Sequence, residues 1–208
     1  MGEFDQVNKS KKKFLLFCSV LTLLVAVSGV ILWCCRASEH HEKAVDTLEN
    51  FLINDTLYAR EIAVAAEKHG VPPLLIKALI KKESRFDANC RGKAGEIGLM
   101  QIIPSASVAD WARVNKCAIP SEKELFEPAK NLDIGCWYLA VKLKKWKKYR
   151  YGMELALAEY NAGAKNTARW KPETLNGEVI KRIDFPLTRK YVTEIMHDYR
   201  EYLIESKQ

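Results

Sequence analysis

A run of 22 residues without a charge, FLLFCSVLTLLVAVSGVILWCC at positions 14–35, constrains this chain more than any other feature. Such a run is long enough to cross a bilayer as a helix. Four lysines lie just before it within residues 9–13, which predicts a cytoplasmic N-terminus and export of the chain beyond residue 35. A cleaved signal peptide is the alternative, although a signal-peptide core is usually shorter and no small-residue cleavage site follows. The sequence therefore predicts a cytoplasmic basic segment at 1–13 and a transmembrane signal anchor at 14–35.

The chain beyond the anchor is long enough for one folded domain. About 170 residues follow, which suffices to bury a hydrophobic core. Residues 36–55 place apolar side chains at helical spacing among charges and predict a juxtamembrane helix or stalk. Apolar residues keep a helical spacing through 56–208, and no β-alternating run of useful length occurs. The predicted fold class is therefore all-α (mainly helical), with one transmembrane helix ahead of a domain at 56–208.

Turn and capping residues divide this domain into its expected helices. We expect Asp55 or Thr56, Ser121 and Thr188 to cap helices. Gly135 lies inside a long helical stretch, which predicts close packing against a neighbour. Residues 87–98 carry too many turn formers for a helix and predict a short hairpin or irregular loop. The expected helices cover residues 57–69, 73–84, 104–115, 128–148, 153–161 and 188–205.

Charge and cysteine content narrow the function classes only partly. The net charge of +7 suits an anionic partner, which includes cell wall, nucleic acid and lipid headgroups. The lysine run at 142–148 is most simply a solvated helix face. Cys90, Cys117 and Cys136 allow one disulfide with one thiol left over, or three unpaired thiols. Their spacing resembles no zinc site, and we expect neither a metal nor a cofactor.

The stretch from Lys82 to Pro104 holds the strongest candidate for chemistry. Continuing the i, i+4 series from Leu75 and Leu79 leads to Glu83, so this carboxyl is expected on the buried face of its helix. It also lies at the helix C-terminus, where the macrodipole disfavours negative charge. Both effects raise a carboxyl pKa. A carboxyl that holds its proton near neutral pH can act first as an acid and then as a base.

Five short motifs carry a resemblance to soluble lytic transglycosylase (SLT) domains. They occur in the family's order and cover most of residues 58–205. The motifs are ESRFD at 83–87, GEIGLMQIIP at 95–104, NLDIGCWYL at 131–139, AEYNAG at 158–163 and PLTRKYV at 186–192. The resemblance implies a lysozyme-like, goose-lysozyme-like helical fold in a bacterial cell-wall enzyme, similar to glycoside hydrolase family 23.

The same resemblance implies a reaction and a location. It implies a membrane-anchored lytic transglycosylase that cleaves the β-1,4 bond between N-acetylmuramic acid and N-acetylglucosamine and forms a 1,6-anhydro end. Glu83 would be the single catalytic acid/base, assisted by the substrate's acetamido group. The partners would be peptidoglycan glycan strands and the bacterial inner membrane, with the domain facing the periplasm and no nucleic acid bound. A goose-type hydrolytic muramidase and a non-catalytic wall-binding domain are the alternatives. Growth, division, recycling and secretion remain open as roles.

Matching motif positions also implies the residues that bind substrate. Amides, tyrosine rings, a thioether and close backbone approach suit a sugar chain. The implied substrate-binding residues are Ser84, Gly98, Met100, Gln101, Tyr160, Asn161 and Tyr191. Three positions depart from the family pattern, because many members have a serine at Gly92 and small or neutral residues at Glu96 and Glu159. Either glutamate could be a second carboxylate near the cleft, but we expect both to face solvent.

Overall fold

The computed structural model describes residues 57–207, and all of the structure below concerns this part of the chain. It is helical, with only isolated β-bridges at Arg91–Ile97 and Ile97–Ile102. The α-helices are α2 (Ala59–His69), α3 (Pro73–Glu83), α4 (Ala109–Asn115), α5 (Glu122–Phe126), α6 (Pro128–Trp146), α7 (Gly152–Trp170) and α8 (Pro186–Glu205). A π-helical turn, η1 (Pro104–Val108), precedes α4, and a 3₁₀ turn, η2 (Ile180–Arg182), precedes α8. The prediction of a mainly helical fold is confirmed.

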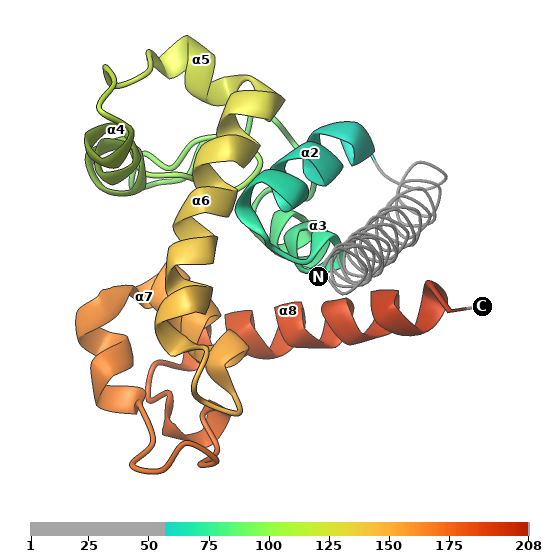
Figure 1. Cartoon of the computed structure of the whole chain (residues 1–208), viewed down its shortest axis with the longest axis vertical. Coiled ribbons are helices and arrows are strands. Elements are labelled where there is room, and N and C mark those ends of the chain that lie inside the picture. Colours follow the sequence, from blue (N-terminus) through green and yellow to red (C-terminus); the bar gives the residue numbers. More distant parts are fainter. Residues whose placement is uncertain (1–56, 208) are drawn as a thin grey trace, which may run out of the picture. The chain divides into compact units, whose positions relative to one another are not determined.

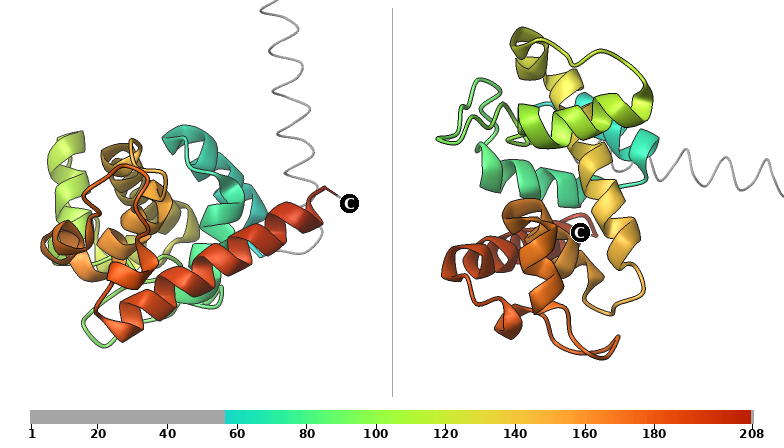
Figure 2. Two further views of the ribbon diagram at one scale, coloured as in Figure 1. Left: turned by 90° about the horizontal axis from the view of Figure 1, so that it is seen from below. Right: turned by 90° about the vertical axis from the view of Figure 1, so that its left-hand side faces the viewer.

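Helix α6 runs through the middle of the domain (Figure 1). It packs against α2 and α7, and α5 and α4 lie toward its N-terminal end. Helix α8 is a long rod that crosses α3 and α7 (Figure 2). The crossing of α3 and α8 brings together segments more than 100 residues apart in the sequence, and the core between the helices is continuous.

The helix starts reflect local chemistry, and two expected caps are wrong. Ser121 forms a capping box with Glu124 as predicted, since each side chain bonds to the other's backbone N–H. Thr188 is not a cap, because Pro186 already begins α8 after Phe185. Its hydroxyl donates instead to the Asn161 side chain. Helix α2 begins after Tyr58 rather than at Asp55 or Thr56.

Two further expectations about packing can be compared with the structure. Gly135 is needed for close approach as predicted, because a Cβ there would lie 2.4 Å from the sulfur of Met100. Lys142 does not belong to a solvated face, since it is 4% exposed and its ammonium lies 3.0 Å from the centre of the Tyr138 ring. Burial lowers its pKa to about 8. Cys90, Cys117 and Cys136 are free thiols.

The described residues do not include the predicted basic segment at 1–13, anchor at 14–35 and stalk at 36–55. Within residues 57–207, no helix combines the length and the hydropathy that crossing a membrane requires.

Candidate active site

Glu83 is the last residue of α3, at the place where α3 crosses α8. Leu75 and Leu79, two turns and one turn earlier, are fully buried, and Glu83 continues their row as a partly buried side chain. The Tyr191 hydroxyl, from α8, donates a hydrogen bond of 2.5 Å to the Glu83 carboxyl. The helical phase therefore placed Glu83 correctly, and the tertiary fold supplies its partner.

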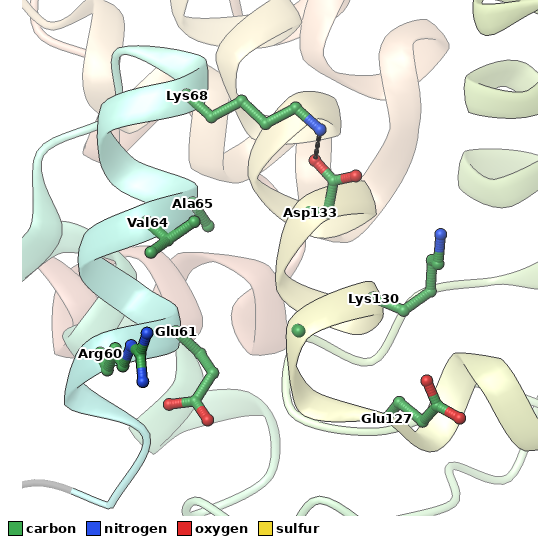
Figure 3. A pocket seen from close by; sticks show the side chains of 9 residues that line it. Arg60, Glu61, Val64, Ala65, Lys68, Glu127, Lys130 and Asp133 are labelled. Atoms are coloured by element: carbon green, nitrogen blue, oxygen red, sulfur yellow. Dashed lines mark ion pairs between the residues drawn. The ribbon is translucent and has the colours of Figure 1, made fainter.

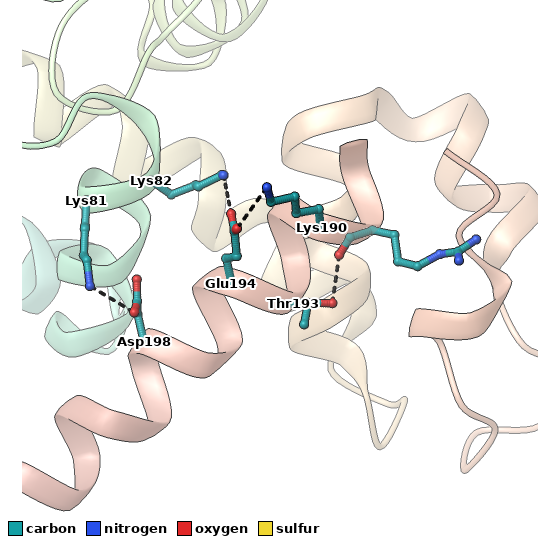
Figure 4. Close-up of polar contacts among 7 residues, drawn as sticks. Lys81, Lys82, Lys190, Thr193, Glu194 and Asp198 are labelled. Atoms are coloured by element: carbon teal, nitrogen blue, oxygen red, sulfur yellow. Dashed lines mark hydrogen bonds and ion pairs between the residues drawn. The ribbon is translucent and has the colours of Figure 1, made fainter. Parts of the chain in front are cut away.

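The surroundings of Glu83 favour its neutral form. Its pKa is raised to about 7, mainly by burial and to a lesser extent by the charge of Glu96. The hydrogen bond from Tyr191 and the charge of Lys82 act in the opposite direction and lower the pKa. Lys82 is bonded instead to Glu194, and Lys81 to Asp198 at 3.0 Å, so both lysines point toward α8 (Figure 4). Glu83 can therefore hold a proton near neutral pH and still release it.

The backbone around Glu83 adopts an uncommon conformation. Arg85 and Phe86, directly after α3, have positive φ angles of 53° and 66°, and Gln101 has a φ of 47°. Non-glycine residues in this left-handed region cost about 1 kcal/mol each and cluster at functional sites. The Ser84 hydroxyl donates to the Leu99 carbonyl at 2.9 Å and thereby ties the end of α3 to the loop carrying Gln101. Ser84 is buried and so supports this loop from behind.

Asn131, at the start of α6, holds the same loop from the other side. Its amide N–H₂ donates to the carbonyls of Ile97 and Leu125, and its side-chain oxygen accepts the N–H of Met100, all at 2.8 Å. A Cβ on Gly98 would lie 2.3 Å from the Asn131 amide nitrogen. Gly98 is therefore required for this contact, in addition to its positive φ of 73°.

Met100 contributes to the site through its backbone rather than its side chain. The side chain is 0% exposed and packs against Gly135 and Cys136. This burial corrects the expectation that its thioether forms a wall of the substrate site. The Met100 carbonyl accepts a hydrogen bond of 2.8 Å from the hydroxyl of Tyr160 on α7. Burial, and to a lesser extent the charge of Glu83, raise the pKa of the Tyr160 phenol.

Gln101 and Asn161 each have one side-chain group engaged within the protein. The amide nitrogen of Gln101 donates to the carbonyls of Cys90 and Gly98 at 3.1 and 3.0 Å, which fixes the orientation of this amide. Asn161 is exposed, and its side-chain oxygen accepts the hydroxyl of Thr188.

The prediction that Glu159 faces solvent is wrong. Glu159 is 7% exposed on α7, and its carboxylate accepts bonds from Lys145 at 2.7 Å and from the indole of Trp146 at 2.8 Å. Glu96 is partly buried, and its carboxylate accepts the N–H of Ala94 at 2.9 Å. Its charge contributes to the raised pKa of Glu83. The expectation that Glu96 faces solvent is therefore met only in part.

Comparison with known proteins shows the family to which this chain belongs. A family model described as "Transglycosylase SLT domain" matches residues 60–182, which is more than half of the chain. The chain belongs to the transglycosylase SLT family. Among named relatives, it is 40% identical over 86 residues to "Membrane-bound lytic murein transglycosylase E" of Buchnera aphidicola, a match of 41% of this chain and 39% of that protein. It is 34% identical over 115 residues to "Membrane-bound lytic murein transglycosylase C" of Histophilus somni, a match of 51% of this chain and 31% of that protein.

Solved structures show the same fold for this SLT domain. An inactive glutamate-to-glutamine variant of the lytic transglycosylase Slt from Pseudomonas aeruginosa superimposes with a TM-score of 0.62 at 26% identity, over 70% of this chain and 24% of that protein. The soluble lytic transglycosylase Slt70 of Escherichia coli gives a TM-score of 0.59 at 22% identity, which supports the fold alone. This chain therefore matches less than half the length of each of these four proteins.

Two hollows in the SLT domain are lined by residues other than Glu83. One, of about 510 Å³, lies between α2 and α6, where Lys68 and Asp133 point toward each other across it (Figure 3). The other, also of about 510 Å³, lies over the ion pairs between α3 and α8 (Figure 4). Among residues 57–207, no group of three or more His, Cys, Asp or Glu side chains could hold a metal ion.

Sequence reasoning missed the roles of Asn131 and Glu159. Asn131 is 0% exposed and precedes Gly135 and Leu139 at i, i+4 spacing, so its place on the buried stripe of α6 was a usable signal. Glu159 lies in an alanine-rich segment that is buried on several sides, so its position in the sequence also indicated burial. A polar side chain in such a position needs a partner, which the sequence does not name.

Proposed function

We propose that this SLT domain is a peptidoglycan lytic transglycosylase in which Glu83 is the single catalytic acid/base. The observation that carries the proposal is the Glu83 carboxyl, whose pKa is raised to about 7 and whose hydrogen-bond partner is the Tyr191 phenol. A carboxyl that changes protonation near neutral pH is suited to successive acid and base steps. The relatives whose names include murein transglycosylase support this substrate and reaction.

The reaction would proceed in two steps through one carboxyl. Protonated Glu83 donates its proton to the glycosidic oxygen as the bond from that oxygen to C1 of N-acetylmuramic acid breaks. The acetamido oxygen of the same sugar stabilises the positive charge at C1, in place of a second carboxylate. Ionised Glu83, which accepts the Tyr191 hydroxyl, then takes the proton of the C6 hydroxyl as this oxygen bonds to C1. The products are a new 4-hydroxyl end and a 1,6-anhydro ring.

The surrounding residues would then take two kinds of role. Tyr191 donates to Glu83 and would orient this carboxyl, and the charge of Glu83 also affects the pKa of Tyr160. We assign both tyrosines to contact with the sugar. The exposed Asn161 and the free side-chain oxygen of Gln101 would bind sugar hydroxyls or acetamido groups. Gly98 allows the loop to adopt its tight path, while Ser84 and the Met100 side chain support that loop from the core.

We also propose that residues 14–35 anchor the domain in the bacterial inner membrane, with residues 56–208 in the periplasm. The uncharged run, the basic residues before it and the words "membrane-bound" in the names of relatives support this proposal. Alkaline extraction of membranes tests it, because an anchored protein stays in the pellet. Recovery of the chain in the wash would contradict the anchor.

Product analysis tests the reaction. The full chain in detergent is incubated with purified sacculi, and the released muropeptides are identified by mass spectrometry. The proposal predicts anhydro products, which are lighter than hydrolysis products by one water, and about 10³-fold less release from the Glu83→Gln variant. Reducing muramic ends alone would overturn the transglycosylase reaction. Binding to sacculi without any release would instead indicate a wall-binding domain.

A hydrolytic muramidase is the second candidate function, and Glu96 is the observation that favours it. Its carboxylate is close enough to Glu83 to affect the pKa of that group. A second carboxylate near the scissile bond could activate a water molecule, as in inverting glycosidases. In that case, Glu96→Gln would abolish turnover, and the products would carry reducing ends.

A further inference from the structure

Gly92 leaves a space that the carboxylate of Glu96 fills. A Cβ built on Gly92 would lie 2.1 Å from Oε2 of Glu96 and 2.8 Å from Oε1 of Gln101. Contacts this short do not occur, so any other residue at position 92 would displace the carboxylate. Gly92 is absent from the glycines with positive φ, so the reason for glycine here is space.

The Glu96 carboxylate is held in this place by its own loop. The N–H of Gly92 donates to the Glu96 carbonyl at 2.9 Å, and the N–H of Gly95 donates to the Gly92 carbonyl at 3.2 Å. The N–H of Ala94 donates to Oε2 of Glu96 at 2.9 Å. Among the described residues no cation is paired with Glu96, and nearby Arg91 is bonded to Glu122 instead. The loop therefore fixes a carboxylate that keeps unused capacity to accept hydrogen bonds.

Gln101 directs a second acceptor to the same place. Its amide nitrogen is committed to the Cys90 and Gly98 carbonyls, so its oxygen is the end that faces Gly92 and Glu96. Both oxygens lie within 3 Å of the position of a Cβ on Gly92, so they are less than about 5 Å apart and a donor group placed between them could reach both. Two acceptors with no donor between them repel each other, and a ligand that brings an O–H or N–H removes this cost. Both side chains are only partly buried, so a ligand can reach them.

We propose that Glu96 and Gln101 form a two-acceptor subsite that receives an O–H or N–H donor of the sugar next to the scissile bond. The assignment of the donor to a sugar rests on the proposed function. The hydrogen bond from Ser84, the neighbour of Glu83, to Leu99 holds this loop against the end of α3, which supports a subsite near the catalytic carboxyl. The effect of the Glu96 charge on the pKa of Glu83 agrees with this placement. Glu96 thus becomes a substrate-contacting residue at a position where the family pattern has a small or neutral residue.

Binding to an inactivated enzyme tests this subsite without turnover. The full chain carrying Glu83→Gln, in detergent, is titrated with soluble peptidoglycan glycan oligomers, and Kd is measured by calorimetry. Adding Glu96→Ala is expected to weaken binding about tenfold, because a hydrogen bond to a charged acceptor is lost. Adding Glu96→Gln, which keeps an acceptor oxygen, is expected to weaken it less. Glu122→Ala is the matched control, since it removes a carboxylate bonded to Arg91 and should leave Kd unchanged.

Gly92→Ala adds a geometric test of the same idea. Alone, it should weaken binding about as much as Glu96→Ala, because the new methyl group displaces the carboxylate. Combined with Glu96→Ala, it should cause no further loss. Equal Kd values with and without Glu96→Ala would overturn the subsite. So would a Glu96→Gln enzyme, otherwise unmodified, whose kcat falls more than 100-fold at constant KM, since this indicates a base.

The outcome for the subsite can be separated from the outcome for the reaction. If the unmodified chain releases anhydro products and Glu96→Ala leaves Kd unchanged, the subsite fails and the proposed function stands. If the unmodified chain releases no products but Glu96→Ala weakens glycan binding, the reaction fails and the subsite stands.

Discussion

A glutamate lies at the crossing of α3 with α8, and another lies where α6 packs against α7. The two carboxyl groups differ in their bonding partners. Glu159 is buried between α6 and α7 and bonds to a cation, Lys145, and to the indole N–H of Trp146. Glu83, at the α3–α8 crossing, bonds to an uncharged phenol, while Lys82 beside it is bonded to Glu194. One carboxylate has a neutralising partner and the other does not.

On this difference we base a structural role for Glu159 and a catalytic role for Glu83. A paired, hydrogen-bonded carboxylate stabilises the contact between two helices and has little capacity left for a ligand. A partly buried carboxyl without a cation keeps its proton to a higher pH, and here the pKa of Glu83 rises to about 7. The comparison predicts that changes at Glu83 alter activity, whereas changes at Glu159 alter stability.

The largest expected effect is on activity at Glu83. Glu83→Gln removes the exchangeable proton and keeps the shape of the side chain, so release of muropeptides from sacculi should fall about 10³-fold, the loss expected for a general acid. Thermal unfolding followed by circular dichroism serves as the control and should show an intact fold. Full activity of Glu83→Gln would contradict the catalytic role of Glu83.

Glu159→Ala should produce the opposite pattern. It leaves the Trp146 N–H without its acceptor and frees Lys145, so we expect a loss of about 2 kcal/mol in the free energy of unfolding. Urea unfolding measures this loss. Activity per folded molecule should stay within about twofold of the unmodified enzyme, and a large drop in kcat for the folded variant would place Glu159 in the chemistry.

Stability should also depend on pH through Glu83. Its folded pKa of about 7 exceeds the reference value of 4.5, so the folded state binds the proton more tightly than the unfolded state. The stabilisation is complete below about pH 4.5 and is lost as the pH rises to about 7 and above. Discounted for partial exposure, we expect a loss on the order of 2 kcal/mol. Urea unfolding at pH 5 and pH 8 should show this loss, and Glu83→Gln should show much less of it.

Tyr191→Phe should give a smaller effect on the same carboxyl. The phenol hydrogen bond favours ionised Glu83, so its loss raises the pKa of Glu83 further. The alkaline limb of the pH–activity profile should move to higher pH, and the maximal rate should fall about tenfold. Thr193→Ala on the exposed side of α8 is the control, and it should leave the profile in place. An unmoved alkaline limb in Tyr191→Phe would show that the phenol does not act on Glu83.

Much of the helical fold was predictable because it is encoded locally. The spacing of Leu75, Leu79 and Glu83 gave the orientation of the carboxyl, and Ser121 with Glu124 gave a helix start. The sequence could not give the partner of Glu83, because Tyr191 lies 108 positions later and meets it only through helix packing. The spacing of residues within one helix does not encode contacts between helices that are far apart in the sequence.

The errors in the site share a physical origin. Glu159 and Lys142 were expected in solvent because charged residues usually lie there. Both are buried instead, Glu159 against Trp146 of α6 and Lys142 against the ring of Tyr138. Met100 was expected at the surface of the site, whereas its side chain fills the space that Gly135 leaves. For Glu159 and Met100 the deciding contact is tertiary, whereas the Lys142 ammonium lies over the ring of Tyr138, one turn earlier on the same helix.

The most direct measurement of the central claim is an NMR titration of the glutamate carboxyl carbons, carried out on the full chain in detergent with selective carbon-13 labelling. One resonance, absent from the Glu83→Gln spectrum, should titrate with a midpoint of about 7. Titration of the Glu83 resonance near the reference value of 4.5 would contradict the claim that this carboxyl is protonated before the reaction begins.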